Sequence, residues 1–139
     1  MVSLSDLPLE STSWVPPSDI RQAKVAIIST AGLHRSSDAR FLDGETDYRI
    51  IPGDVDAADL VMSHRSVNFD RSGFQQDVNV VFPLEHLRKL AAQGEIGSVA
   101  TWHYSFLGAA NPIRLQTSGA QVGRLLREDG VSAALLFPV

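Results

Sequence analysis

The stretch Lys24-Val-Ala-Ile-Ile-Ser-Thr30 is a short apolar run rich in β-branched residues, and Ala31-Gly32 follows it directly. A run of this length with apolar residues at successive positions is typical of a strand that is buried on both faces of a parallel sheet. A glycine-containing exit from such a strand is where a doubly wound sheet places a ligand-binding loop. The stretch therefore predicts a central strand with a site at its carboxyl end.

The C-terminal half of the chain supplies the other elements that such a sheet requires. Leu84–Ala91 and Ala120–Glu128 carry apolar residues at helical spacing, and Asp129-Gly130 ends the second of these segments. Val131–Phe137 is then a second apolar run. We predict an α/β fold: a mostly parallel sheet flanked by helices in a Rossmann-like, three-layer single domain, with Lys24–Thr30 and Val131–Phe137 as buried strands.

The remaining segments are less regular. Residues 1–22 are interrupted by prolines and are expected to form an extended N-terminal arm, which leaves residues 23–139 as the α/β domain. Within the polar segment 31–78, Tyr48–Ile51 is expected to form a short strand. The apolar residues of Ala57–Met62 fit either another short strand or one helical turn.

Composition narrows the class of protein. The chain has 139 residues, of which 44% are hydrophobic and 20% charged, as is usual for one soluble domain. A net charge of −4 is unfavourable for binding nucleic acid through its phosphates, and no apolar run approaches the roughly 20 residues of a membrane span. We therefore expect a cytoplasmic protein that binds neither nucleic acid nor membrane. The absence of cysteine excludes disulfides, zinc–thiolate sites and a cysteine nucleophile within these residues.

Three of the four histidines are candidates for catalysis, since His34, His64 and His103 fall in loops or near the ends of expected elements, whereas His86 falls on the outer face of a helix. Their spacings of 30 and 39 residues match no metal signature, so we expect no metal. The three side chains are predicted to converge as proton donors or substrate ligands. The alternative is that they are structural histidines with satisfied hydrogen bonds.

Three polar residues are candidates for binding a substrate. Asp77 and Asn79 are two residues apart, which on a strand places both side chains on one face, where they would hold an amine. The alternative is an Asx turn or a helix cap. Arg35, which follows His34 at the exit of the first strand, is the third candidate.

Several segments taken together resemble the selenoprotein B family of the glycine, sarcosine, betaine and D-proline reductases, and in particular its short, single-domain members. The resemblance extends from Val25 to Val139. It rests on Val25-Ala-Ile-Ile-Ser-Thr-Ala-Gly-Leu-His34, Asp47-Tyr-Arg-Ile-Ile-Pro-Gly-Asp54, Ala58-Asp-Leu-Val-Met-Ser-His64, Phe74-Gln-Gln-Asp-Val-Asn-Val-Val-Phe-Pro83 and Gly94-Glu-Ile-Gly97.

The resemblance implies an oxidoreductase subunit that cleaves a carbon–nitrogen bond reductively. A selenolate or thiolate attacks the carbon that bears the amine of a small amine or amino-acid-like substrate, and a thioredoxin-type dithiol donor supplies the electrons. A partner subunit, in some systems one with a pyruvoyl group, or a homo-oligomer is also implied. No cofactor is expected in this chain itself.

The family's nucleophile resembles a Sec-x-x-Cys or Cys-x-x-Cys element just after the strand that here ends Leu135-Leu-Phe-Pro-Val139. Because the 139 residues contain no cysteine, we expect the C-terminal part of the domain to be missing and selenocysteine to be encoded by an in-frame UGA after the Val139 codon. His34 is expected within about 15 Å of Val139, at the carboxyl edge of the sheet. The alternative function is a non-catalytic α/β binding or interaction module that has lost the redox element.

Overall fold

The computed structural model describes residues 15–16, 19–64, 72–108 and 110–139. Most of the arm predicted over residues 1–22 lies outside the described residues. The part that is described ends in a 3-10 helix, η2 (Ile20–Gln22), where the side chain of Asp19 accepts a hydrogen bond from the backbone N–H of Arg21. This short helix leads directly into the first strand of the sheet.

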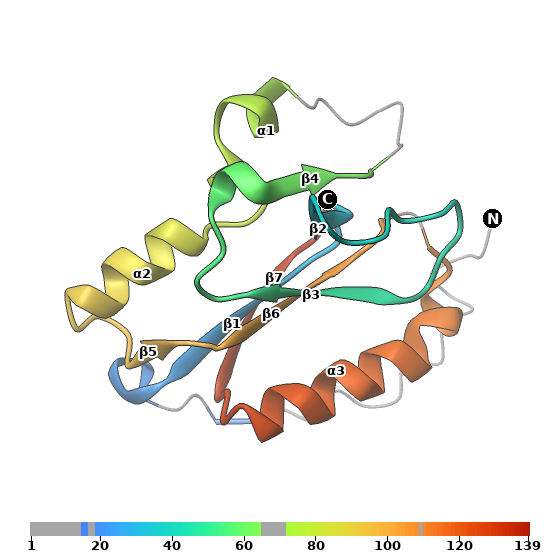
Figure 1. The fold of residues 1–139 in the computed structure, drawn as a ribbon. Coiled ribbons are helices and arrows are strands. Elements are labelled where there is room, and N and C mark those ends of the chain that lie inside the picture. Colours follow the sequence, from blue (N-terminus) through green and yellow to red (C-terminus); the bar gives the residue numbers. More distant parts are fainter. Residues whose placement is uncertain (1–14, 17–18, 65–71, 109) are drawn as a thin grey trace.

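The sheet is built around β1 (Lys24–Ser29), as the apolar run predicted (Figure 1). One edge of β1 pairs in parallel with β7 (Ala133–Phe137). Its other edge pairs in parallel with β5 (Ser98–Val99) and then with β6 (Trp102–Phe106). The antiparallel strand β3 (Tyr48–Pro52) pairs with β6 on the outer side. The predicted α/β fold with a mostly parallel sheet is confirmed.

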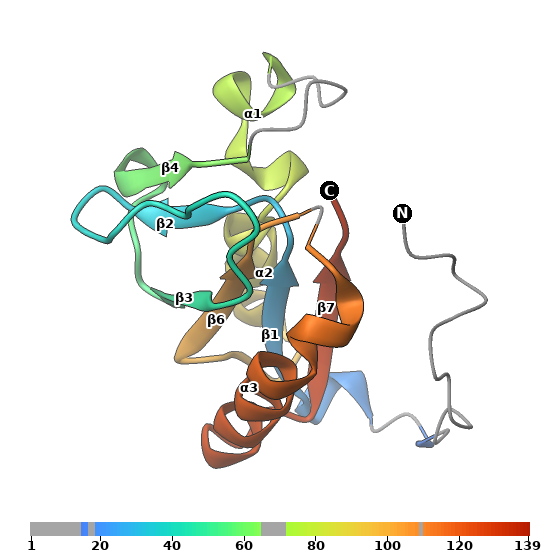
Figure 2. The ribbon, with the colours of Figure 1, turned by 90° about the vertical axis from the view of Figure 1, so that its right-hand side faces the viewer.

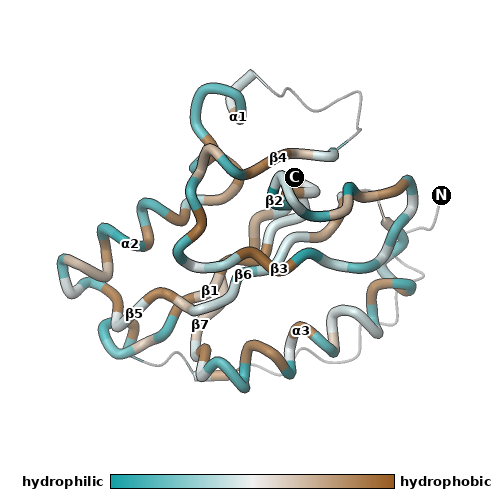
Figure 3. The backbone as a smooth tube through the Cα atoms, in the orientation of Figure 1, coloured by the Kyte–Doolittle hydropathy of each residue, from teal (hydrophilic) through white to brown (hydrophobic). Residues whose placement is uncertain are grey.

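Two helices cover opposite faces of this sheet and complete three layers (Figure 2). On one face, Leu87 of α2 (Leu84–Ala92) joins the core cluster that includes Ile27 of β1. On the other face, Val122 of α3 (Gln116–Glu128) packs with Tyr104 of β6. Both helices alternate between hydrophobic and hydrophilic residues along the chain (Figure 3), as expected for helices with one buried side.

Helix α3 begins at Gln116, four residues before the predicted start at Ala120. A 3-10 helix, η5 (Pro112–Leu115), runs directly into it, and the Asn111 side chain accepts a hydrogen bond from the N–H of Ile113. The cap and the proline together start the helical path early, because both satisfy the requirements of a first turn.

The polar segment after β1 forms a separate sheet of two strands near the carboxyl end of the main sheet. Strand β2 (Leu33–Arg35) pairs antiparallel with β4 (Leu60–Met62). The two alternatives for Ala57–Met62 both occur, since a 3-10 helix, η3 (Ala57–Asp59), precedes β4. A short helix, α1 (Ser72–Gln76), and a 3-10 helix, η4 (Val78–Val80), then lead to α2.

Strand β7 corrects one expectation. The segment is a strand, but it is not buried: residues along it alternate between half-buried and exposed, and Leu136 is 70% exposed. Within the described residues β7 pairs only with β1 and therefore forms an edge of the sheet. An apolar run does not distinguish a central strand from an edge strand whose outer side is uncovered.

Within the described residues, no helix is both long enough and apolar enough to cross a membrane.

Candidate functional site

The carboxyl ends of β1 and β7 are joined through Thr30, the first residue after β1. Its backbone N–H donates to the carbonyl of Phe137 at 3.0 Å. Its hydroxyl oxygen accepts from the backbone N–H of Val139 at 2.8 Å and lies 3.3 Å from the carbonyl oxygen of the same residue, to which it donates. Val139 therefore lies at the edge of the sheet from which the segment Thr30–Arg35 departs (Figure 2).

His64 lies at this same edge. It follows β4, is 4% exposed, and packs its imidazole against the backbone of Gly108. A Cβ atom at Gly108 would be 2.5 Å from Nε2 of His64 and 2.9 Å from the carbonyl oxygen of Thr30. The absence of a side chain at residue 108 is what leaves room for this imidazole at the end of β1.

His34 on β2 is joined to the residue before His64. Its Nδ1 lies 2.8 Å from the carbonyl oxygen of Arg35 and its Nε2 lies 2.8 Å from the hydroxyl oxygen of Ser63. A carbonyl oxygen only accepts, so Nδ1 carries a proton, and in the neutral ring Nε2 accepts from the Ser63 hydroxyl. A buried imidazole held in one tautomer against a half-buried hydroxyl is suited to moving a proton.

Arg35 forms an ion pair rather than standing free. Its Nη2 lies 2.9 Å from Oδ1 of Asp38, and its Nε lies 3.2 Å from Oδ2 of the same carboxylate. The hydrogen bond from the guanidinium and the charge of Asp38 raise the pKa of Arg35 above its ordinary value. The side chain is 40% exposed and borders a cavity of about 370 Å³.

His103 has a different environment from the other two histidines. Between the paired positions Val25–Val99 and Ile28–Tyr104, two residues of β1 face four residues of the neighbouring chain. In the resulting interruption of the ladder, the N–H of Ile27 donates to Nδ1 of His103 at 2.9 Å. Burial, with a smaller effect of Arg88, lowers the pKa of His103 to about 4, so the ring is neutral at pH 7.

Of the three candidate histidines, the structure separates His103 from the other two. His34 and His64 lie at the carboxyl edge and are connected through Ser63, whereas His103 is a fully buried core residue whose ring contacts Phe82 edge to face at 5.7 Å. His103 has the position of a structural histidine, but only its Nδ1 is hydrogen-bonded, since Nε2 is buried with no partner among the described residues. A catalytic role for His34 and His64 stays a prediction.

Asp77 and Asn79 adopt the geometry of the cap alternative. Asp77 precedes η4, and its Oδ1 accepts from the backbone N–H of Asn79 at 2.9 Å and from the side-chain amide at 2.8 Å. These hydrogen bonds hold the pKa of Asp77 below its ordinary value. The two-residue spacing thus lies on a 3-10 turn and not on a strand, and a role in binding an amine stays a prediction.

Sequence reasoning missed Thr30, Ser63 and Gly108. Thr30 and Gly108 were recognisable only as residues near strand ends, and the partner that each contacts is more than 40 residues away in the sequence. Ser63 precedes a singled-out histidine, but it bonds to the other one, His34, because β2 and β4 pair. Within residues 19–64, 72–108 and 110–139, no three His, Asp or Glu side chains gather as a metal site.

Comparison with known proteins gives the family that the sequence segments resemble, and the match covers nearly the whole chain. Residues 5–138 match the family described as glycine/sarcosine/betaine reductase selenoprotein B. The chain is 33% identical over 127 residues to D-proline reductase subunit gamma of Acetoanaerobium sticklandii, covering 88% of this chain and 52% of that protein. No solved structure matches the chain.

A second relative is the sarcosine reductase complex component B subunit beta of Peptoclostridium acidaminophilum. It is 30% identical over 143 residues, covering 95% of this chain and 32% of that protein. Glycine reductase complex component B subunit gamma of Carboxydothermus hydrogenoformans is 22% identical over 141 residues, again covering 95% of this chain and 32% of the relative. The chain thus spans from about a third to about half the length of these relatives.

Proposed function

The chain belongs to the glycine/sarcosine/betaine reductase selenoprotein B family, and from this membership we propose that it acts within a reductase component that cleaves a carbon–nitrogen bond of a small amine or amino-acid-like substrate. The names of the relatives describe subunits of reductases and reductase complexes, which supports a partner subunit for this chain. The substrate, the chemical step and the electron donor are parts of this proposal.

The observation that supports a reaction at the carboxyl edge is the arrangement around Thr30. The hydroxyl of Thr30 holds Val139, the buried imidazole of His64 packs beside the Thr30 carbonyl, and His34 is bonded to Ser63 one residue before His64. Carboxyl ends of parallel strands are the usual position of a site in such sheets. A polar, partly buried edge with two imidazoles suits a reaction that must move protons.

In the proposed reaction, the nucleophile forms a bond to the substrate carbon while the carbon–nitrogen bond breaks and the electron pair of that bond leaves with the amine. The leaving nitrogen needs a proton, which we assign to His64, or to the imidazolium form of His34, whose Nε2 then donates to the Ser63 hydroxyl as that hydroxyl gives its own proton to the nitrogen. The 139 residues contain no cysteine, so the selenolate or thiolate is proposed to be supplied from outside them. One thiolate of a thioredoxin-type dithiol donor then attacks the selenium or sulfur, and the substrate carbon leaves with the bonding electron pair and takes a proton. The second thiol of the donor displaces the selenolate or thiolate, which is thereby regenerated, and the donor becomes a disulfide.

The nucleotide sequence after the codon for Val139 tests where the nucleophile is encoded. An in-frame UGA, followed by further coding sequence with a cysteine three codons on, supports selenocysteine as the nucleophile. A UAA or UAG codon with no continuation removes the nucleophile from the gene. That result would instead favour the non-catalytic binding or interaction module.

The turnover of the complete reductase component tests which residues donate the proton to the leaving nitrogen. Amine release is measured with a dithiol donor for His34→Gln, Ser63→Ala and His64→Gln, with His86→Gln as the matched control on the exposed side of α2. We expect at least one edge variant to lose about 100-fold in turnover and the control to keep its activity. Unchanged turnover in all three edge variants would return these residues to structural roles.

A further inference from the structure

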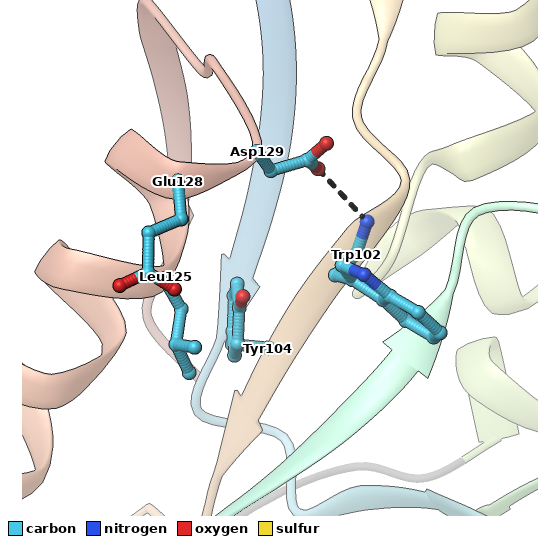
Figure 4. A pocket seen from close by; sticks show the side chains of 5 residues that line it. All are labelled: Trp102, Tyr104, Leu125, Glu128 and Asp129. Atoms are coloured by element: carbon cyan, nitrogen blue, oxygen red, sulfur yellow. Dashed lines mark hydrogen bonds between the residues drawn. The ribbon is translucent and has the colours of Figure 1, made fainter.

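A concave site lies at the end of the sheet opposite to the carboxyl edge. A pocket of about 270 Å³ is formed where α3 ends and β6 begins (Figure 4). Because β6 runs parallel to β1, its first residue, Trp102, lies at the end of the sheet opposite Thr30. The lining residues are Trp102, Tyr104, Leu125, Glu128 and Asp129.

The Tyr104 side chain brings an unpaired hydroxyl to this pocket. The residue is 1% exposed and lines the pocket, yet its hydroxyl makes no hydrogen bond with any residue that the structure describes. The hydroxyl oxygen is not sealed from solvent, so it is open to a hydrogen-bond donor that enters the pocket. Burial, together with the charge of Asp129, raises the pKa of Tyr104. The phenol is therefore neutral and offers its lone pairs to a donor.

Two carboxylates and, among the described residues, no lysine or arginine line the pocket. The Asp129 carboxylate is already occupied, since it accepts from the Lys24 ammonium at 3.2 Å, from the Thr101 hydroxyl at 2.8 Å and from two backbone N–H groups. Glu128 is exposed and forms no ion pair within the described residues. Its charge adds to the negative end of the α3 dipole. The pocket therefore favours a cation over an anion.

The remaining walls favour a cation that carries an apolar body. Trp102 is 43% exposed, and aromatic faces attract cations that lie above them. Figure 4 shows Leu125 and Glu128 of α3 on one side, Trp102 on the other and Tyr104 between them. An adjoining cavity of about 370 Å³ shares three of these side chains and continues past Ile50 and Pro52 to the Arg35–Asp38 pair.

We infer that this pocket binds an alkylammonium group: the ammonium donates to the Tyr104 hydroxyl and the Glu128 carboxylate, while the alkyl chain lies along Trp102 and Leu125 toward Ile50. The ammonium belongs either to a free amine or to a lysine side chain of a protein partner. The site is independent of the proposed reaction at the carboxyl edge. The Arg35–Asp38 pair carries no net charge, so the ammonium is directed to the Glu128 end.

Titration of the 139-residue chain with n-butylammonium chloride tests the inference. The readout is the set of NMR signals of the Trp102 indole and of residues 125–129, with n-butanol as the uncharged isostere and butanoate as the anion. We expect saturable shifts with butylammonium, at least fivefold weaker binding of butanol, and no binding of butanoate. Equal binding of butylammonium and butanol, or shifts outside the pocket only, would overturn the site.

Two conservative variants identify the contacts. Glu128→Gln removes the charge at an exposed position, and Tyr104→Phe removes only the hydroxyl; each is expected to weaken butylammonium binding at least threefold. Glu95→Gln, an exposed glutamate beyond α2, is the matched control and should bind as the unmodified chain does. Unchanged binding in both pocket variants would reject the assignment.

Nα-acetyl-lysine-N-methylamide distinguishes the two sources of the ammonium group. Binding as tight as that of butylammonium assigns the pocket to a lysine side chain, and binding at least fivefold weaker assigns it to a free amine.

Discussion

The imidazole of His64 occupies the space that a side chain at residue 108 would fill: a Cβ atom at Gly108 would lie 2.5 Å from Nε2 of His64. It would also lie 2.9 Å from the carbonyl oxygen of Thr30. Both distances are shorter than carbon tolerates in a folded protein. Placement of a buried histidine at the carboxyl edge thus depends on a glycine 44 residues away in the sequence.

Replacing Gly108 by alanine is predicted to destabilise the fold and move His64. The added methyl group overpacks the edge, which typically costs about 1–3 kcal/mol. Urea unfolding measures the loss. Gly123→Ala in α3 is the control, because a Cβ atom there meets nothing within 4 Å and alanine favours a helix by about 1 kcal/mol. Equal effects of the two substitutions would show that the edge relaxes freely around residue 108.

Removing the Thr30 hydroxyl is predicted to loosen the end of β7. Thr30→Val keeps the shape of the side chain but removes the hydrogen bonds to Val139, each contributing about 1 kcal/mol. The backbone amide of Val139 should then exchange with solvent about fivefold faster, as measured by NMR hydrogen exchange. Thr117→Val on the exposed side of α3 should leave that rate unchanged. An unaltered rate in Thr30→Val would mean that the backbone alone holds this end.

His103 is predicted to make stability depend on pH in the acidic range. Its pKa is about 4 in the fold and near 6.5 when unfolded, so the unfolded state binds more protons between these values. The contribution of His103 is complete above pH 6.5 and is lost as pH falls toward 4. It decreases by about 2 kcal/mol between pH 7 and pH 5.

An NMR titration of the His103 ring measures this pKa directly, and Nδ1 should stay without a proton because it accepts from Ile27. A titration midpoint above pH 6 would contradict the buried neutral ring. Urea unfolding at pH 7 and pH 5 gives the accompanying change in the free energy of unfolding.

A charged residue at position 136 is predicted to reduce self-association of the 139-residue chain. β7 is an apolar edge strand whose residues carry no charge, and such edges pair readily with other chains. Leu136→Lys places a charge on the side chain that is 70% exposed, with less than about 0.5 kcal/mol effect on stability. Sedimentation velocity should show less oligomer. Leu135→Lys, at the neighbouring half-buried position, should instead destabilise the fold by about 2 kcal/mol.

Local pattern was enough to predict the elements whose apolar residues repeat along the chain. The run Lys24–Thr30, the helix around Leu87 and the helix ending before Asp129 all appear close to the predicted bounds. Each depends on neighbours within a few residues. The exposure of β7 was not predictable in this way, because it depends on whether another element lies beyond the edge.

The candidate site likewise combines features that the sequence determines with features that depend on contacts between distant residues. The amino-acid sequence alone determined the α/β class, the absence of a cysteine nucleophile within these residues and the family to which the chain belongs. Only the tertiary structure decided that His34 bonds to Ser63, that His64 packs on Gly108 and that His103 serves the core. The physical reason is that a run of side chains reports its own periodicity, whereas a contact between strands depends on pairing and register across the whole fold.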